Sequence, residues 1–344
     1  MKEALKLKVT PAPHTKSSVT VTGIMLDVII ALIPACFAAA AIFGFRAAAI
    51  ILTCVVSSVG FEYITRKILN RTTTIGDLSA VITGILLSLT LPVTVPLWMC
   101  VAGSFVAIVV IKQMFGGIGH NFANPAITAR IVLQVSFPDI MTTFVSPAKN
   151  YIDATATATP LSYLAELDLS GDISSQISIL TKDGDIPEFF NMLFGVRAGC
   201  IGEGCIAALM LGAVYLILRG IISPAIPLTF IGTTALIMSA TASFNLSFTF
   251  YQILGGGLVL GAFFMATDYV TSPVSKKGKI IFGIGCGLVT ALIRLFADSP
   301  EGVSYAILFM NILCPLIEGV TAPKYFGFVR KKKNTDEATQ EVTA

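Results

Sequence analysis

The sequence predicts an all-α integral membrane protein of about ten transmembrane helices, some of them broken, and three observations support this fold class. Hydrophobic residues make up 55% of the 344 residues and charged residues only 12%, whereas soluble domains carry about 25% charged residues. The mean hydropathy is +0.83. A helix needs about 20 apolar residues to cross a bilayer, and the chain offers about ten such stretches.

The predicted spans fall into two groups of five, separated by a long polar segment. They are 24–44, 47–65, 78–92, 96–114, 124–138, 200–218, 221–240, 249–267, 279–296 and 303–320. Several are short or broken, at Pro92, Pro96, Pro125 and Pro273. Non-helical backbone at membrane depth survives only where protein or a cavity satisfies its polar groups. The breaks therefore favour a protein with an internal site over a simple anchor.

Five spans on each side of the polar segment predict two inverted five-helix repeats, as in many transporters. Glycines within 116–119 precede Asn124-Pro125 in the first half, and glycines within 255–257 precede Pro273 in the second. Coincidence between two apolar segments is the alternative, because the two halves are only weakly similar. The predicted regions are a cytoplasmic N-terminus (1–23), the first half (24–138), an extracytoplasmic loop (139–199), the second half (200–320) and a cytoplasmic tail (321–344).

Lysine and arginine set the predicted orientation, because cytoplasmic segments of membrane proteins are enriched in both. Seventeen of the 23 basic residues fall on the side of the N-terminus, among them Arg66 and Lys112, and five on the other side, among them Arg46 and Arg197. Both termini are therefore expected in the cytoplasm. The bases serve as topology signals, and no basic surface interleaved with aromatic residues indicates nucleic acid as a partner.

The polar segment contains Asp153, followed by alternating alanine and threonine up to Thr159 and then Pro160-Leu161. An acidic residue, several small residues and then Ala-Thr is the layout of a covalent flavin acceptor, in which a threonine hydroxyl carries FMN through a phosphoester. Small neighbours leave room for a transferase, so we expect an exposed loop. The alternative is a small-residue loop with no chemistry.

Acidic residues in the predicted spans are the next candidates, because an unpaired charge at the bilayer centre costs about 2.5–3.5 kcal/mol or more. Asp77 and Glu203 stand at helix starts, where capping explains them, and Glu62 is expected to reach water. Asp27, Asp268 and Glu318 are harder to explain structurally. A carboxylate suits a small cation or a proton, so these three are candidates for ion coupling, with a structural role as the alternative.

The seven cysteines lie mostly in apolar stretches and form no CxxC motif, so a disulfide framework is not expected. Cys200 and Cys205 could ligate a metal, but small apolar filler is the favoured interpretation and no metal is predicted. The chain also has no dinucleotide-binding fingerprint and no iron–sulfur cysteine cluster. It is therefore expected to bind neither NAD nor ferredoxin's clusters itself.

Four blocks carry a resemblance to a known family. They are Gly-Gly-Ile-Gly-His-Asn-Phe-Ala-Asn-Pro-Ala at 116–126, the Thr159 motif, Leu-Gly-Ala-Phe-Phe-Met-Ala-Thr-Asp at 260–268 and Asn-Ile-Leu-Cys-Pro-Leu-Ile-Glu at 311–318. From about residue 10 to 325 the chain resembles the D subunit of the Rnf ferredoxin:NAD+ oxidoreductase complex. It is also similar to the B subunit of the sodium-translocating NADH:quinone oxidoreductase, but its shorter N-terminus favours the Rnf family.

The resemblance implies a ten-helix subunit of an ion-pumping redox complex in the cell membrane, inactive alone. Electrons would pass between ferredoxin and NAD+ through sibling subunits while Na+ or H+ is moved outward. A quinone-reducing complex and a non-redox secondary transporter are the alternative functions. The implied partners are the other subunits, membrane lipid, the transported cation and a flavin transferase for maturation.

The resemblance also implies which residues hold cofactors. FMN would be bound to Thr159, with Asp153 as the acid of the motif. Ala156 and Thr157 depart from the family pattern, and Thr155 and Thr157 also follow alanine, but the spacing from Asp153 favours Thr159.

A second, non-covalent flavin, generally riboflavin in the family, is implied within the membrane part. Gly119, Asn121, Asn124 and Arg130 are its candidate contacts. An asparagine offers both a donor and an acceptor. Turn and capping chemistry is the alternative for the first three, and pairing with an acidic residue is the alternative for Arg130.

Overall fold

The computed structural model describes residues 19–146, 157–167, 171–184, 186–195, 197–297 and 301–322. Within these ranges every regular element is helical, and an isolated antiparallel bridge joins Pro92 and Cys200. The elements of the first half are α1 (Val21–Ile68), η1 (Ile75–Asp77), α2 (Ser79–Leu89), α3 (Leu97–Phe105), the π-helix η2 (Val106–Gln113), α4 (Pro125–Ser136) and α5 (Pro138–Met141). The prediction of an all-α protein is confirmed for the described residues.

The polar segment and the second half are helical as well. Their elements are α6 (Pro160–Ala165), α7 (Ile173–Asp183), α8 (Phe189–Phe194), η3 (Ile201–Glu203), α9 (Ile206–Leu218), α10 (Ala225–Thr241), α11 (Leu246–Leu254), α12 (Leu258–Leu260), the π-helix η4 (Gly261–Met265), α13 (Lys276–Phe296) and α14 (Val303–Thr321). By length and composition α1, α13 and α14 can each cross a membrane, and α11 with α12 and η4 forms a fourth candidate bent by 64°.

Two breaks interrupt the helices at glycines, and the sequence predicts the first of them as a boundary between spans. Gly44 has φ 71° and ψ −163° inside α1, at the boundary between the predicted spans 24–44 and 47–65. A positive φ of this kind suits glycine, which has no Cβ. The break between α11 and α12 lies at the glycines of 255–257, inside the predicted span 249–267, where no break was expected.

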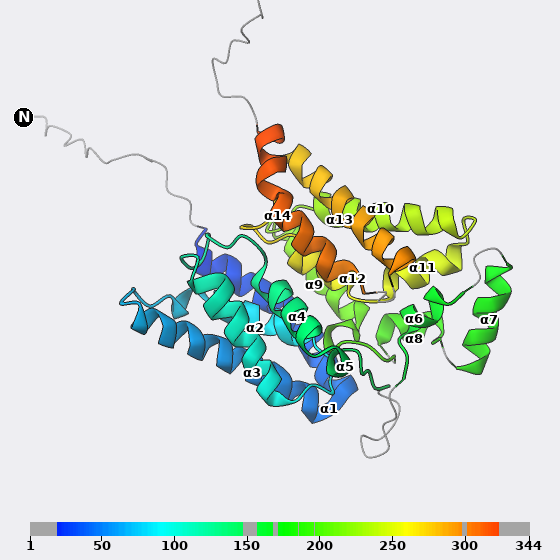
Figure 1. Cartoon of the computed structure of the whole chain (residues 1–344), viewed down its shortest axis with the longest axis horizontal. Helices are drawn as coiled ribbons and strands as arrows, with labels where there is room; N and C mark the ends of the chain where they lie inside the picture. Colours follow the sequence, from blue (N-terminus) through cyan, green and yellow to red (C-terminus); the bar gives the residue numbers. More distant parts are fainter. Residues whose placement is uncertain are drawn as a thin grey trace, which may run out of the picture.

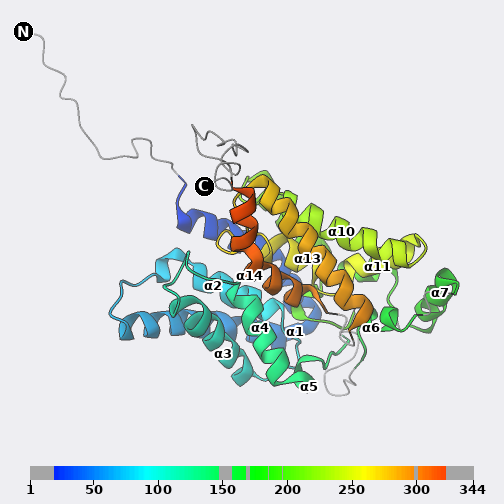
Figure 2. The same cartoon turned by 45° about the horizontal axis from the view of Figure 1, so that its top comes forward.

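The helices of the two halves gather on two sides of the molecule. Helices α1 to α4 lie together on one side, and α10, α11, α13 and α14 lie together on the other, in both views (Figures 1 and 2). Helix α9 packs on α1, and α4 packs on α14, so each half contacts the other. One apolar core runs through α1, α2, α4, α9, η4, α13 and α14.

Small residues let helices of this core approach closely, as is usual between helices in membranes. A Cβ added to Gly84 of α2 would lie 2.8 Å from the carbonyl oxygen of Cys54 in α1. A Cβ added to Gly212 of α9 would lie 2.1 Å from the carbonyl oxygen of Ala31 in α1. Both glycines therefore mark close backbone contacts with α1.

The described part of 139–199 is more structured than the predicted loop. Leu161, Ile177 and Met192, from α6, α7 and α8, share a second apolar core with Phe248 and Ala291 of the second half. Helix α7 forms the edge of the molecule in both views (Figures 1 and 2). At its N-terminus Asp172 accepts a hydrogen bond from the amide of Ser174, and a further one from the Ser175 hydroxyl is the main cause that lowers the pKa of Asp172.

Candidate functional site

A cavity between the two halves brings together three of the candidate residues, Asn121, Asn124 and Asp268. We call it the Asn124 cavity. Its walls come from α1, α2, η2, α4, α9 and η4 and from the segments that follow these helices. Most of the wall surface is apolar and is formed by side chains such as Ile82, Leu86, Phe263 and Phe264. Binding sites for small molecules are typically apolar clefts with a few polar groups that fix orientation.

Asn124 joins the broken segments of the two halves. Its side-chain oxygen caps α4 by accepting from the amides of Ala126 (3.1 Å) and Ile127 (3.3 Å), so the capping interpretation is confirmed. Its Nδ2 donates to the carbonyl of Met265 at the end of η4 (3.2 Å). The side-chain amide of Asn311 is oriented so that its oxygen accepts from the backbone amide of Asn124 and its nitrogen donates to the backbone carbonyl of Thr271, each at 3.1 Å.

Asn121 presents an unpaired acceptor at the cavity. Its Oδ1 is buried and has no hydrogen-bond partner within the part of the chain that the structure describes. Gly119, by contrast, is exposed, has φ +89° and does not line the cavity. The structure therefore gives Gly119 the turn geometry that was its alternative interpretation.

Asp268 lines the cavity from the segment after η4 and is half-buried. Its Oδ2 accepts from the hydroxyl of Thr271 at 3.1 Å. Among the described residues no lysine, arginine or histidine forms a salt bridge with it. Asp268 is therefore the carboxylate of the cavity that is available to a cation.

A buried ion pair adjoins the cavity, and the sequence interpretation missed it. The ammonium of Lys112 lies 3.0 Å from Oε2 of Glu62 and 2.6 Å from the hydroxyl of Ser79. Glu62 also accepts from Thr74 (2.7 Å) and Gln113 (3.0 Å). The side chains of Lys112 and Glu62 are 2% and 0% exposed, so the expectation that Glu62 reaches water is wrong.

Thr159 lies elsewhere, and the expectation of an exposed acceptor is wrong. Its side chain is 8% exposed, and its hydroxyl caps α6 by accepting from the amide of Ser162 at 3.3 Å. Together with Arg197, Glu203 and Glu301 it lines a small cavity. Asp153, the acid of the motif, lies outside the described residues.

Arg130 pairs with an acidic residue rather than lining the Asn124 cavity. Its guanidinium forms a salt bridge with Glu301 and donates to the hydroxyl of Ser304 (2.7 Å) at the start of α14. It also lies 3.7 Å from Sγ of Cys200. Arg130 thus connects α4 of the first half to α14 of the second.

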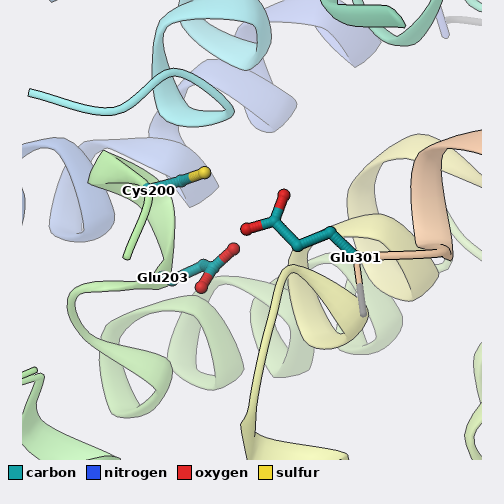
Figure 3. Close-up of side chains that lie close together, drawn as sticks. All are labelled: Cys200, Glu203 and Glu301. Atoms are coloured by element: carbon teal, nitrogen blue, oxygen red, sulfur yellow. The ribbon is translucent and has the colours of Figure 1, made fainter. Parts of the chain in front are cut away.

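Cys200 and Glu203, from the segment that forms η3, and Glu301, from the residues just before α14, point toward one another (Figure 3). One ligand atom of each lies within 4.8 Å of the others. The guanidinium of Arg130 already contacts Glu301 and Cys200 and supplies the positive charge of this cluster. Cys200 thus contacts Arg130 and also belongs to a small apolar cluster, as its interpretation as apolar filler expects, with Phe144 and Ala198.

Two further buried arginines hold the break between α11 and α12. Arg197 donates to the carbonyls of Leu254 (2.7 Å) and Glu203 (3.0 Å), and Arg294 donates to the carbonyl of Gly255 at 3.2 Å. The bonds to Leu254 and Gly255 satisfy carbonyls that a bent helix leaves without partners, and the bond to Glu203 ties η3 to this break. An arginine inside the predicted span 279–296 was the sequence signal for this role.

The other two candidate acids lie outside the Asn124 cavity. Asp27 forms a salt bridge with Arg219 (3.1 Å) and accepts from the Tyr215 hydroxyl at 2.7 Å. Glu318 accepts from the amide of Val274 at 3.0 Å. Asp27 is therefore paired, and Glu318 holds the segment between Asp268 and α13.

Curated proteins similar to this chain belong to redox complexes by name. The D subunit of the Na(+)-translocating ferredoxin:NAD(+) oxidoreductase complex of Acetobacterium woodii is 43% identical over 96% of this chain and 98% of its own length. The D subunit of the Proton-translocating ferredoxin:NAD(+) oxidoreductase complex of Clostridium ljungdahlii is 40% identical over 93% and 96%. The D subunit of the Ion-translocating oxidoreductase complex of Stutzerimonas stutzeri is 35% identical over 90% and 92%.

The sequence pattern of one family covers nearly the whole chain. It matches residues 8–327, a range that includes both halves, the Asn124 cavity and the Thr159 segment. Together with the near-complete coverage of its relatives, this match shows that the chain belongs to the NQR2, RnfD, RnfE family.

Proposed function

We propose that this chain is the D subunit of an ion-translocating ferredoxin:NAD+ oxidoreductase complex, a membrane flavoprotein subunit in a redox-driven pump. The observation that carries the proposal is the Asn124 cavity, where Asn121, Asn124 and Asp268 meet, in a chain 43% identical to a protein of that name. The protein acts with its sibling subunits and not alone. The transported cation is Na+ or H+, the two ions that the names of its relatives give.

The proposed covalent cofactor is FMN, held by a phosphoester on Thr159. Thr159 and Arg197 line the same small cavity, and a guanidinium suits a phosphate group. Attachment requires the hydroxyl to leave its capping position on α6. Loss of an N-cap bond costs only about 1 kcal/mol, so a flavin transferase can reach Thr159 by opening this one helix end.

The proposed second, non-covalent flavin, riboflavin or a related one, occupies the Asn124 cavity. Its chemistry there is electron transfer, which the cofactor itself supplies. The residues fit such a group, because the unpaired Oδ1 of Asn121 offers an acceptor and the Phe263 and Phe264 side chains offer apolar surface.

Asp268 provides the proposed link between electrons and cations. Because it lines the same cavity as Asn121 and Asn124, negative charge arriving in the cavity raises the affinity of its carboxylate for a cation or proton. Glu318 and Asp27 are proposed to contribute to the ion path as well. Glu318 does so from the segment that it holds in place, and Asp27 from its pair with Arg219.

The proposed arrangement in the cell membrane has ten spans in two inverted five-helix repeats. The packing of α4 on α14 and of α9 on α1 supports such a relation, because each contact joins helices at the same position in the two halves. Both termini lie in the cytoplasm, and residues 139–199 lie outside with the FMN. The proposed partners are the other subunits, membrane lipid and the flavin transferase.

Fluorescence of the denatured chain tests the proposal. In cells that contain the flavin transferase, Thr159→Ala should abolish the flavin fluorescence of the denatured band, while Thr157→Ala retains it. The opposite pattern would place the acceptor one Ala-Thr unit earlier. A wild-type band without fluorescence would contradict the covalent flavin altogether.

A further inference from the structure

We propose that Lys112 is a positioning residue that sets the redox potential of the flavin in the Asn124 cavity, through a buried dipole that it forms with Glu62. This inference rests on the proposed second flavin. It concerns Lys112, interpreted from the sequence only as a topology signal, and Glu62, expected from the sequence to reach water.

The dipole has a fixed orientation relative to the cavity. Lys112 and Ser79 line the Asn124 cavity, and the ammonium of Lys112 donates to the Ser79 hydroxyl at 2.6 Å. Glu62 does not belong to the lining and lies behind Lys112, 3.0 Å from its Nζ. The positive end of the pair therefore faces the cavity.

Both ends of the dipole are held in place. Glu62 accepts from three side chains, Lys112, Thr74 and Gln113. Burial of both charged side chains, at 2% and 0% exposure, keeps water from screening the charge. The pair adjoins the π-helical stretch η2, which holds both Lys112 and Gln113, and π-helical turns are frequent at functional sites.

The dipole acts on any negative charge that enters the cavity. In the proposed pump the electron comes from reduced ferredoxin, an iron–sulfur protein, through the sibling subunits. An electron adds one negative charge to the cavity unless a proton follows it. Lys112 favours that charge, whereas Asp268 on the same cavity opposes it. The redox potential of a flavin in the cavity thus depends on the balance between the positive charge of Lys112 and the negative charge of Asp268.

The test is a redox titration of the non-covalent flavin in the purified complex, with Lys112→Gln, Lys112→Arg and the double variant Lys112→Gln/Glu62→Gln. Lys112→Gln leaves Glu62 as an uncompensated negative charge, so the midpoint potential should fall furthest. The double variant removes both charges and should lie between Lys112→Gln and the wild type. Lys112→Arg keeps the positive charge and should stay near the wild type.

The double variant is also expected to fold where Lys112→Gln does not, because it leaves no unpaired buried charge. If Lys112→Gln does not assemble, a potential of the double variant below the wild type still supports the proposal. Potentials equal to the wild type in every assembled variant would overturn it. Loss of the non-covalent flavin from the variants would also overturn it, because Lys112 would then hold the flavin rather than set its potential.

Flavin content distinguishes this inference from the proposed function. A wild-type complex that releases no non-covalent flavin on denaturation would contradict the second flavin itself. A wild-type complex that releases it, with unshifted potentials in the variants, would contradict only the role of Lys112.

Discussion

Asp268 lies on a cavity wall and has no basic partner among the described residues. Asp27 differs, because it lies outside the cavity and is paired with Arg219. Asp268→Asn keeps an acceptor for the Thr271 hydroxyl but removes the charge. We expect unchanged covalent flavin on Thr159 and reduced cation uptake by membrane vesicles, normalised to bound flavin. An unchanged ratio, or a lower amount of complex with normal uptake per flavin, would assign Asp268 a structural role.

At Glu318, variants can distinguish a role of the negative charge from a role of the hydrogen bond to the backbone. Its carboxylate accepts from the Val274 amide, and a glutamine oxygen can accept the same bond. If the charge matters for ion coupling, Glu318→Gln should reduce uptake per flavin about as much as Glu318→Ala does. Normal uptake in Glu318→Gln with a defect only in Glu318→Ala would show that Glu318 serves the backbone of 268–275 alone.

Arg130 is a residue whose removal the structure predicts to cost stability. Its removal would leave Glu301, 12% exposed, without its cation. Breaking a buried pair by removing one partner costs about 3–5 kcal/mol. We therefore expect Arg130→Met to lower the thermal unfolding midpoint of the complex in detergent.

The double variant Arg130→Met/Glu301→Leu is the matched control for Arg130. It removes both charges, so most of the lost stability should return. Equal midpoints for Arg130→Met and the wild type would show that water replaces the pair.

At the scale of elements, the close contact of α9 with α1 at Gly212 leads to a prediction on stability. Gly212→Ala places a Cβ 2.1 Å from the Ala31 carbonyl of α1, whereas a Cβ on Gly232 of α10 meets no atom within 4 Å. Overpacking typically costs about 1–3 kcal/mol, so Gly212→Ala should lower the unfolding midpoint.

Gly232→Ala is the control for the same chemical change at an open position. Alanine is favoured over glycine in helices by up to about 1 kcal/mol, so this variant should match or exceed the wild type. Equal losses in both variants would mean that the α1–α9 contact is not the cause.

At the scale of the whole molecule, the proposed orientation predicts which surfaces face the cell exterior. Ser178 is exposed on α7, and Lys276 is exposed at the start of α13. In intact cells Ser178→Cys should react with an impermeant thiol reagent, and Lys276→Cys should react only after lysis. The native cysteines are all buried or half-buried. Reaction of Lys276→Cys before lysis would overturn the ten-span arrangement.

The sequence by itself determined the properties that depend on neighbouring residues. Apolar stretches located the helices, because each helix needs its own apolar length. Gly44 marked the boundary between two spans, because a glycine permits the local backbone conformation of the break. Asn124-Pro125 predicted the start of α4, because the asparagine cap bonds only to amides of the next three residues.

Only the tertiary structure decided which distant side chains meet. Lys112 and Glu62 are 50 residues apart and Arg130 and Glu301 are 171 apart, so no local pattern could reveal either pair. The same holds for the meeting of Asn124 with Asp268 in one cavity. The burial of Thr159 also followed from packing, because α6 lies against α11 and Arg197 lies beside it. A charge in an apolar stretch shows that a partner or a function is needed, but long-range packing decides which of the two it is.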